Sequence, residues 1–363
     1  MKENTMASGR LSLRSMVFGG GAVLMLMPAI IAGTFYTGAL QRRAETLLVE
    51  RLKARGELSA SLLGRRLNQL WQEVSALSKI IDVDAPAKSR DSLNLISQLD
   101  TRYSWIGVAD VAGTVLIASR GMLEGQSVAE RPWFRRGLRG PTAVDVHQAQ
   151  MLAKLMPAAA EPYHFIDMAA PIQKSNAVIG VVGAHLDWRW VVDSLNNLQA
   201  PGIELLLLSR ERTVLYGPAS LIDKPLNIGA AQAANRVTLA VLDERWSDGK
   251  DYVTVVVPSI SYGDLPGFGW SLLVRQNLDE ALATTRELVR TFWLMLGAGA
   301  IVALALLYLG SHWITTPLRR LASSSEAIVA DGEQTIPYLE TRYAEAARLS
   351  HALVRLQSKI SRR

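Results

Sequence analysis

Two long stretches without a charged residue constrain this chain most. Residues 15–41 carry no charge over 27 positions, and residues 291–311 carry none over 21. An α-helix rises about 1.5 Å per residue, so either stretch can cross a hydrocarbon core of about 30 Å. The first stretch is too long for the apolar part of a cleaved signal peptide, and no small-residue cleavage pattern follows it. Both are predicted to be membrane-spanning helices, at residues 15–41 and 291–313.

The excess of positive charge lies outside the segment between these helices. The chain has a formal net charge of +6, but residues 41–290 hold 28 basic and 27 acidic side chains. A nearly neutral segment without a basic stripe argues against nucleic acid as a partner. Because the chain has no cysteine, disulfides and thiolate metal sites are excluded.

A long helix is predicted directly after the first span. Apolar residues recur at helical spacing through residues 40–81, and no proline interrupts them, although Gly56 and Gly64 lower the local helix propensity. Such a helix would be about 60 Å long. It can pack against the same helix of a second copy or against its own domain, and the pattern does not choose between the two.

Two small α/β modules are predicted after this helix. The first has a helix at 91–103, a hairpin of strands at 105–110 and 114–119, a helix at 129–139, and two strands at 164–172 and 178–186. Residues 140–162 are expected to be the least regular part, with a short helix ending near Met156. The second module repeats the architecture, with strand pairs at 203–208 and 213–217 and at 252–259 and 269–276.

The sequence Arg131-Pro132-Trp133-Phe134 is the strongest candidate for a binding site. A guanidinium beside large aromatic rings can hold a small polar or anionic ligand. The alternative is a structural corner, in which the aromatic rings are core and the arginine is solvated.

After the second span, the sequence Thr316-Pro317-Leu318 is expected to break the helix. Amphipathic helices are then predicted at 318–330 and 343–360, joined by a connector with Gly332 and Pro337. Two helices of this size cannot bury their apolar stripes alone, so a four-helix coiled coil of two chains is expected.

This C-terminal part resembles a HAMP domain. The matching residues are Pro317-Leu318, the Gly332 connector with Ile336-Pro337, and Glu345 ahead of Leu349, placed immediately after a membrane helix. The resemblance implies a homodimer that relays a signal to a cytoplasmic output domain or protein.

Residues 42–290 resemble a double Cache (dCache) sensor domain, whose two modules are PAS-like. The resemblance rests on Asp110 with Gly113, on Arg131-Pro132-Trp133-Phe134, on the run from Val181 to Leu186, and on Gly267-Phe268-Gly269-Trp270. It implies an α+β fold in which a long N-terminal helix carries two modules with antiparallel sheets. It also implies a bacterial receptor of the inner membrane, with residues 1–14 and the HAMP domain at 314–363 in the cytoplasm and the sensor in the periplasm. In this family the ligand usually binds the membrane-distal module, here about 90–187, rather than the proximal module at about 200–276.

Three positions depart from the amino-acid-binding branch of this family. That branch has tyrosines where this chain has Gln126 and Phe134, and an aspartate where it has His185. Arg131 and Trp133 fit the pattern. Binding of a free amino acid in the usual way is therefore not expected.

Three of the five histidines, His147, His164 and His185, fall in the distal module, together with Asp145 and Asp167. The candidate ligand-binding residues are Arg131, Trp133, Phe134, Asp145, His147, Asp167 and His185. His164 is expected at the surface and Asp110 in a turn. A metal site formed by histidines and a carboxylate is an alternative to a polar ligand pocket. The histidine spacings of 17 and 21 residues are not those of a local metal motif, however, so no metal and no cofactor are expected.

The leading hypothesis is a transmembrane receptor that binds a small polar or anionic solute in the distal module. One alternative is a membrane-anchored scaffold whose Cache domain contacts a protein. Another is a pH sensor, since histidine titrates near pH 6–7. No Ser/His/Asp or paired-carboxylate arrangement is found at useful spacing, so the chain is not expected to be an enzyme.

Overall fold

The computed structural model describes residues 12–148, 151–157, 162–234, 236, 238–331 and 338–360. The chain divides into two compact units. One consists of Met1–Arg43 with Thr284–Arg363, and the other is Ala44–Ala283. Each unit is described by itself.

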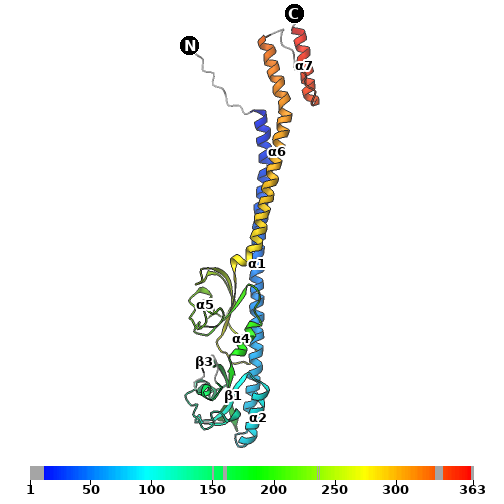
Figure 1. Cartoon of the computed structure of the whole chain (residues 1–363). Helices are drawn as coiled ribbons and strands as arrows, with labels where there is room; N and C mark the ends of the chain where they lie inside the picture. The colour runs from blue at the N-terminus through cyan, green and yellow to red at the C-terminus, as the bar shows by residue number, and fades with distance from the viewer. Residues whose placement is uncertain are drawn as a thin grey trace. The chain divides into compact units, whose positions relative to one another are not determined.

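The unit Ala44–Ala283 is assembled on helix α1 (Leu13–Ile80), and both sheets lie along this helix (Figure 1). One face of the helix is part of the core, with Leu52, Leu63 and Leu67 fully buried. The two helix glycines allow close packing, since a Cβ on Gly56 would lie 3.0 Å from Val257 and one on Gly64 would lie 3.1 Å from a backbone oxygen. The long helix therefore packs against its own domain.

The distal module contains one five-stranded antiparallel sheet in the order β2-β1-β5-β4-β3. Its strands are β1 (Tyr103–Asp110), β2 (Val115–Ala118), β3 (Thr142–Gln148), β4 (His164–Lys174) and β5 (Ala177–Asp187). Its helices are α2 (Pro86–Leu99), α3 (Pro132–Gly137) and α4 (Arg189–Asn196), with short 3₁₀ turns η1 (Ser119–Gly121) and η2 (Leu152–Lys154).

The proximal module repeats this topology, with strand order β7-β6-β10-β9-β8. Its elements are β6 (Ile203–Leu208), β7 (Val214–Tyr216), α5 (Gly229–Ala233), β8 (Ala240–Arg245), β9 (Asp251–Val257) and β10 (Ser271–Asn277). The strands of the two sheets are therefore connected in the same order along the chain. The predicted α+β fold, with two modules of antiparallel sheet, is confirmed.

The distal sheet is covered on both faces. On β4, Ile166 and Met168 belong to the core that includes α1, whereas Phe165 and Ala169 belong to a second core with α3. Because side chains alternate between the faces of a strand, Asp167 points to the α3 side of the sheet.

Several predicted boundaries in the distal module were wrong. The segment expected to be irregular contains β3, whose partly buried residues show no clean alternation between apolar and polar side chains. The helix expected at 129–139 is only Pro132–Gly137, because Arg131 has the extended backbone of a helix N-cap. The helix expected near Met156 is only the turn η2, and the helix expected at 91–103 is α2, which begins at Pro86.

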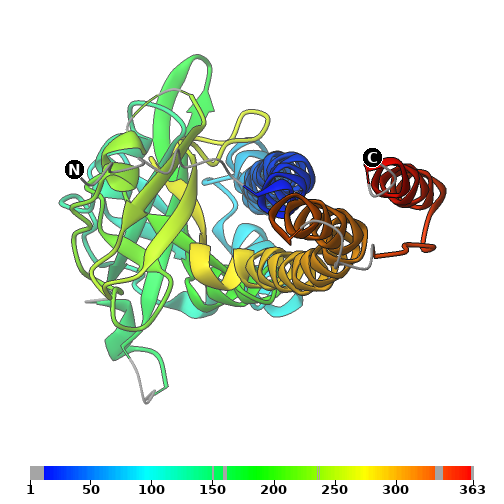
Figure 2. The same cartoon turned by 90° about the horizontal axis from the view of Figure 1, so that it is seen from above.

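The other unit contains the start of α1, helix α6 (Leu278–Asp331) and helix α7 (Ala344–Ile360). By length and composition, α1 and α6 can each cross a membrane. They lie side by side in this unit (Figure 2), where the ring centroids of Phe18 and Tyr308 are 6.1 Å apart.

The helix break expected at Thr316-Pro317-Leu318 is absent, because α6 continues through Pro317. The preceding threonine hydroxyls donate hydrogen bonds to helix carbonyls, Thr315 to Ser311 at 2.7 Å and Thr316 to His312 at 2.5 Å. Both bonds lie in the helical turn that leads into Pro317. The expected connector residues Gly332, Ile336 and Pro337 lie outside the described residues.

Candidate functional site

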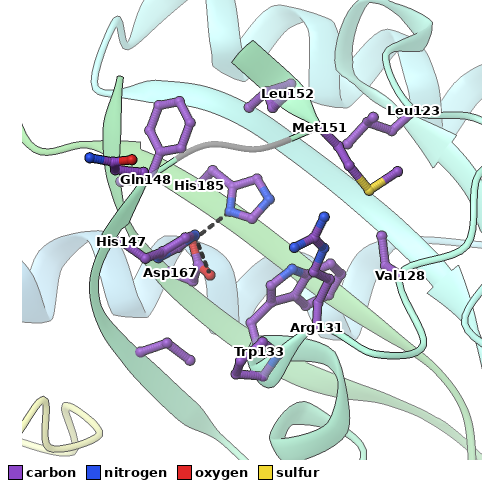
Figure 3. A pocket seen from close by; sticks show the side chains of 13 residues that line it. Leu123, Val128, Arg131, Trp133, His147, Gln148, Met151, Leu152, Asp167 and His185 are labelled. Atoms are coloured by element: carbon purple, nitrogen blue, oxygen red, sulfur yellow. Dashed lines mark hydrogen bonds and ion pairs between the residues drawn. The ribbon is translucent and has the colours of Figure 1, made fainter. Parts of the chain in front are cut away.

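A cavity of about 310 Å³ lies on the α3 side of the distal sheet (Figure 3). Five of the seven predicted site residues line it, namely Arg131, Trp133, His147, Asp167 and His185. The remaining lining residues are Leu123, Val128, Pro132, Val144, Gln148, Met151, Leu152 and Phe165. The cavity therefore combines an apolar wall with a few polar groups, which is typical of small-molecule sites.

Strand register brings the polar residues together. Asp167 on β4 is paired with His185 on β5, and the two side chains hydrogen bond through Oδ1 and Nδ1 at 2.5 Å. His147 comes from β3, where the register shifts between Val144 and His147. A shift of this kind re-aims a side chain, and here both Val144 and His147 face the cavity. The Nε2 atom of His147 lies 3.5 Å from Oδ2 of Asp167.

The carboxylate of Asp167 is buried. Only 2% of its side chain is exposed, compared with 11% for His185 and 39% for His147. Within the described ranges, these two imidazoles are the basic side chains within 4 Å of its oxygens, and no lysine or arginine pairs with it. A buried carboxylate is costly unless positive charge or hydrogen-bond donors surround it. This group is therefore well placed to attract a cation or a donor from a ligand.

Aromatic rings surround His185. The ring centroids of Trp105, Trp133 and Phe165 lie 4.9, 5.9 and 5.8 Å from the imidazole. Trp133 packs directly over Gly183, where an added Cβ would lie only 2.5 Å from the indole ring. Glycine at this position is thus required for the aromatic wall to lie against the sheet.

Arg131 supplies the positive charge of the site. It is the N-cap of α3, with φ −77° and ψ 135°, and Pro132 begins the helix. The side chains of Arg131 and His185 point toward one another across the cavity (Figure 3). No hydrogen bond or ion pair of the Arg131 side chain occurs in the part of the chain that the structure describes.

The acidic side chains close to Arg131 in sequence are paired elsewhere. Glu130 binds Arg135, and Glu124 accepts two hydrogen bonds from Arg90, at 2.8 and 2.9 Å. The Arg131 guanidinium is therefore available to a ligand, and a planar guanidinium suits carboxylates and phosphates.

Two predicted site residues do not line the cavity. Phe134 is buried behind Trp133, with ring centroids 5.9 Å apart, and supports the wall. Asp145 accepts a hydrogen bond from Nε1 of Trp270 in the proximal module, at 2.6 Å. Burial raises the pKa of Asp145, while the Trp270 hydrogen bond acts in the opposite direction. Asp145 therefore connects the two modules.

Asp110 and His164 lie outside the cavity. Asp110 occupies a turn, since its Oδ1 accepts hydrogen bonds from the backbone N–H groups of Ala112 and Thr114, both at 2.9 Å. His164 does not line the cavity, and it is half-buried at the start of β4 rather than fully exposed.

Sequence reasoning missed the apolar lining. Phe165 could have been found, because it lies two residues before Asp167 and so shares its strand face. The others, such as Leu123 and Met151, come from irregular segments without a periodic pattern.

A buried core occupies part of the corresponding face of the proximal sheet. Trp246 and Tyr252 pack with the alanines of α5 in a buried core. The guanidinium of Arg275 stacks 3.9 and 4.1 Å from these two rings and pairs with Glu204. This arginine is already satisfied, in contrast to Arg131.

Two sheets of identical strand order, carried on one long helix, define the double Cache fold. A scan against protein-family models and a search of curated proteins gave no match. Among solved structures, the chain is similar to the ligand-binding domain of the Pseudomonas fluorescens chemoreceptor CtaA in complex with L-leucine. That match has 20% sequence identity and a TM-score of 0.50, and covers 68% of this chain and 99% of that one.

The chain is also similar to the ligand-binding domain of PctB, a Pseudomonas aeruginosa amino acid chemoreceptor, in complex with L-arginine. Here the identity is 18% and the TM-score 0.51, over 67% of this chain and 93% of that one. Both are ligand-binding domains rather than catalytic domains. At this identity the likeness establishes the fold, and the predicted double Cache fold is confirmed.

Proposed function

We propose that this protein is a transmembrane signal-transduction receptor. A small polar or anionic solute binds in the distal cavity, and binding shifts a two-state equilibrium that is relayed to a cytoplasmic output. Such a relay requires that the solute bind the two states with different affinity.

The observation that carries this proposal is the unpaired guanidinium of Arg131 in a cavity of about 310 Å³. A structural arginine would be expected to stack and pair, as Arg275 does in the proximal module. The fold supports the same function, because the similar domains of CtaA and PctB bind L-leucine and L-arginine. Here His185 stands where the amino-acid-binding branch has its aspartate, and the acidic residue is Asp167 on the neighbouring strand β4. We therefore expect a ligand to be held in a different orientation from that branch.

The test is a metabolite screen by thermal unfolding, using the full chain in lipid nanodiscs. A solute present at 100 times its Kd adds about 2.7 kcal/mol to the free energy of unfolding. We expect carboxylates or other anions to shift the melting temperature of the wild type and not that of Arg131→Ala. If no compound shifts the wild type, a scaffold that contacts a protein becomes the better account. A signalling response to pH without any bound solute would favour the pH sensor.

The relay that we propose uses residues 314–363 as a HAMP domain in a homodimer. In the described part of α7, Leu349 and Leu356 are 47% and 57% exposed, so the described residues of one chain leave this apolar stripe uncovered. A second copy would cover it in a four-helix coiled coil. In this proposal residues 1–14 lie in the cytoplasm, residues 15–41 and 291–313 span a bacterial inner membrane, and the sensor at 42–290 lies in the periplasm. Cross-linking of single cysteines introduced into α7 would test the dimer.

A further inference from the structure

We propose that His147, Asp167 and His185 bind a divalent first-row transition-metal ion of the zinc type, as part of the sensing site. This inference rests on the proposed function, because it concerns the same cavity. The three residues come from three neighbouring strands, and one ligand atom from each lies within 4.8 Å of the others.

The spacing is close to that of a bound ion. Metal–ligand bonds of 2.0–2.1 Å in a tetrahedral site place the ligand atoms about 3.3 Å apart. Asp167 and His185 are buried and held together by their hydrogen bond at 2.5 Å. His147 is 39% exposed and can move. Metal binding would replace the Asp167–His185 hydrogen bond: Nδ1 of His185 releases its proton to solvent, the two atoms separate by about 1 Å, and His147 rotates to supply the third ligand.

The hydrogen bond of His147 fixes which nitrogen is free. Its Nδ1 lies 3.2 Å from the backbone oxygen of Asp145. A carbonyl oxygen only accepts hydrogen bonds, so Nδ1 carries the proton and the Nε2 of the neutral ring carries a lone pair. That lone pair faces Oδ2 of Asp167 at 3.5 Å. Metal-binding histidines are usually oriented through their second nitrogen in this way.

Two electron-pair donors that face each other repel unless a cation lies between them. A protonated imidazole could supply the charge, but 3.5 Å is too long for a hydrogen bond of that type. A metal ion instead accepts an electron pair from both atoms. It also neutralises the buried carboxylate of Asp167, which no lysine or arginine of the described residues does.

The donor set selects the metal. Two imidazoles and one carboxylate suit zinc and its first-row neighbours, whereas calcium and magnesium prefer oxygen ligands. Three protein ligands leave a fourth position open. Here that position faces the cavity, and Arg131 on its wall favours an anionic fourth ligand over water.

The test uses the full chain without a polyhistidine tag, in nanodiscs and stripped of metal with EDTA. Zn²⁺ and Co²⁺ are titrated alone by calorimetry, and the visible spectrum of bound Co²⁺ reports tetrahedral coordination. We expect one ion per chain. Affinity should fall by at least about tenfold in His147→Gln and Asp167→Asn, and stay unchanged in His164→Gln, a histidine of the same module outside the cluster.

Asp167→Asn places an uncharged amide in the core and could unfold the module. His147 is half-exposed, so His147→Gln is the variant that decides the test. Equal Zn²⁺ affinity in the wild type and His147→Gln would overturn the proposal, and so would the absence of saturable binding in the wild type. The solute screen is run separately, with and without EDTA. If a solute binds equally well in EDTA and Zn²⁺ does not bind, the metal site is rejected and the receptor function is retained. If Zn²⁺ binds at this cluster and no solute binds, the metal site is supported and the solute-binding function is rejected.

Discussion

Replacing Gly183 by alanine tests whether the aromatic wall of the cavity depends on this glycine. Gly183 lies on the central strand β5, where it is paired with Gly107 on one side and Ala169 on the other. The added Cβ would lie 2.5 Å from Trp133, whereas an ordinary contact begins at 3.4 Å. Because β5 is held from both sides, the indole must move by about 1 Å.

The expected cost follows from the packing. Trp133 is 1% exposed and is packed between Trp105 and Phe134, so it has little room to move. Overpacking of a filled core costs about 1–3 kcal/mol. For a unit of this size, each kcal/mol lowers the melting temperature by about 2–4 °C, so we expect a decrease of about 2–12 °C. The displaced indole also narrows the cavity, so solute affinity falls.

Thermal unfolding, monitored by tryptophan fluorescence, measures the decrease in melting temperature. Calorimetric titration measures the decrease in solute affinity. Gly140→Ala is the matched control, because a Cβ there meets nothing within 4 Å. If Gly183→Ala and Gly140→Ala melt at the same temperature and bind solute equally, the packing argument is refuted.

Two further predictions concern stability. Arg90 holds the pKa of Glu124 below its ordinary value, so the ion pair stabilises the fold above about pH 4.3 and its contribution is lost as the pH falls through the lowered pKa. Wild type and Glu124→Gln should therefore differ most in melting temperature near pH 7 and converge as the pH falls below the lowered pKa of Glu124, and a constant difference would count against the pair. Asp145→Ala leaves the buried indole N–H of Trp270 without its acceptor and should lower the free energy of unfolding by about 1–3 kcal/mol. Asp145→Asn keeps an acceptor oxygen and should lose less, and equal losses would argue against this hydrogen bond.

Much of the fold could be predicted from sequence because its signals are local. The uncharged runs, the helical spacing along α1 and the β4–β5 hairpin can each be recognised within one continuous stretch of sequence. The turn of that hairpin has Ser175 and Asn176 at positive φ, 52° and 67°, a conformation that asparagine tolerates well. The strand β3 lacked such a signal, because its register shift disturbs the alternation.

The candidate site was only partly predictable, because it depends on pairing between distant strands. Arg131 and Trp133 are close in sequence and were identified together. Asp167 and His185 meet only through the register of β4 and β5. The cluster with His147 gave no metal motif in the sequence, since its ligands lie on three strands and the spacing between strands is set by loop lengths rather than by coordination geometry.

Asp145 was predicted to bind ligand, but it does not line the cavity. Its position two residues before His147 suggested a shared strand face and a ligand contact, but the register shift of β3 between Val144 and His147 breaks that alternation. Its actual partner is Trp270, which is 125 residues away. Such a contact between modules cannot be read from a local pattern.

Calorimetric titration of the strongest solute from the screen tests the central claim most directly. It compares wild type, Arg131→Ala and Arg139→Ala in the full chain, where Arg139 is an exposed arginine just after α3. Loss of a charged hydrogen bond corresponds to a decrease in affinity of about 10- to 100-fold. We predict this decrease for Arg131→Ala and none for Arg139→Ala. Equal affinity in wild type and Arg131→Ala would contradict a binding site in the distal cavity.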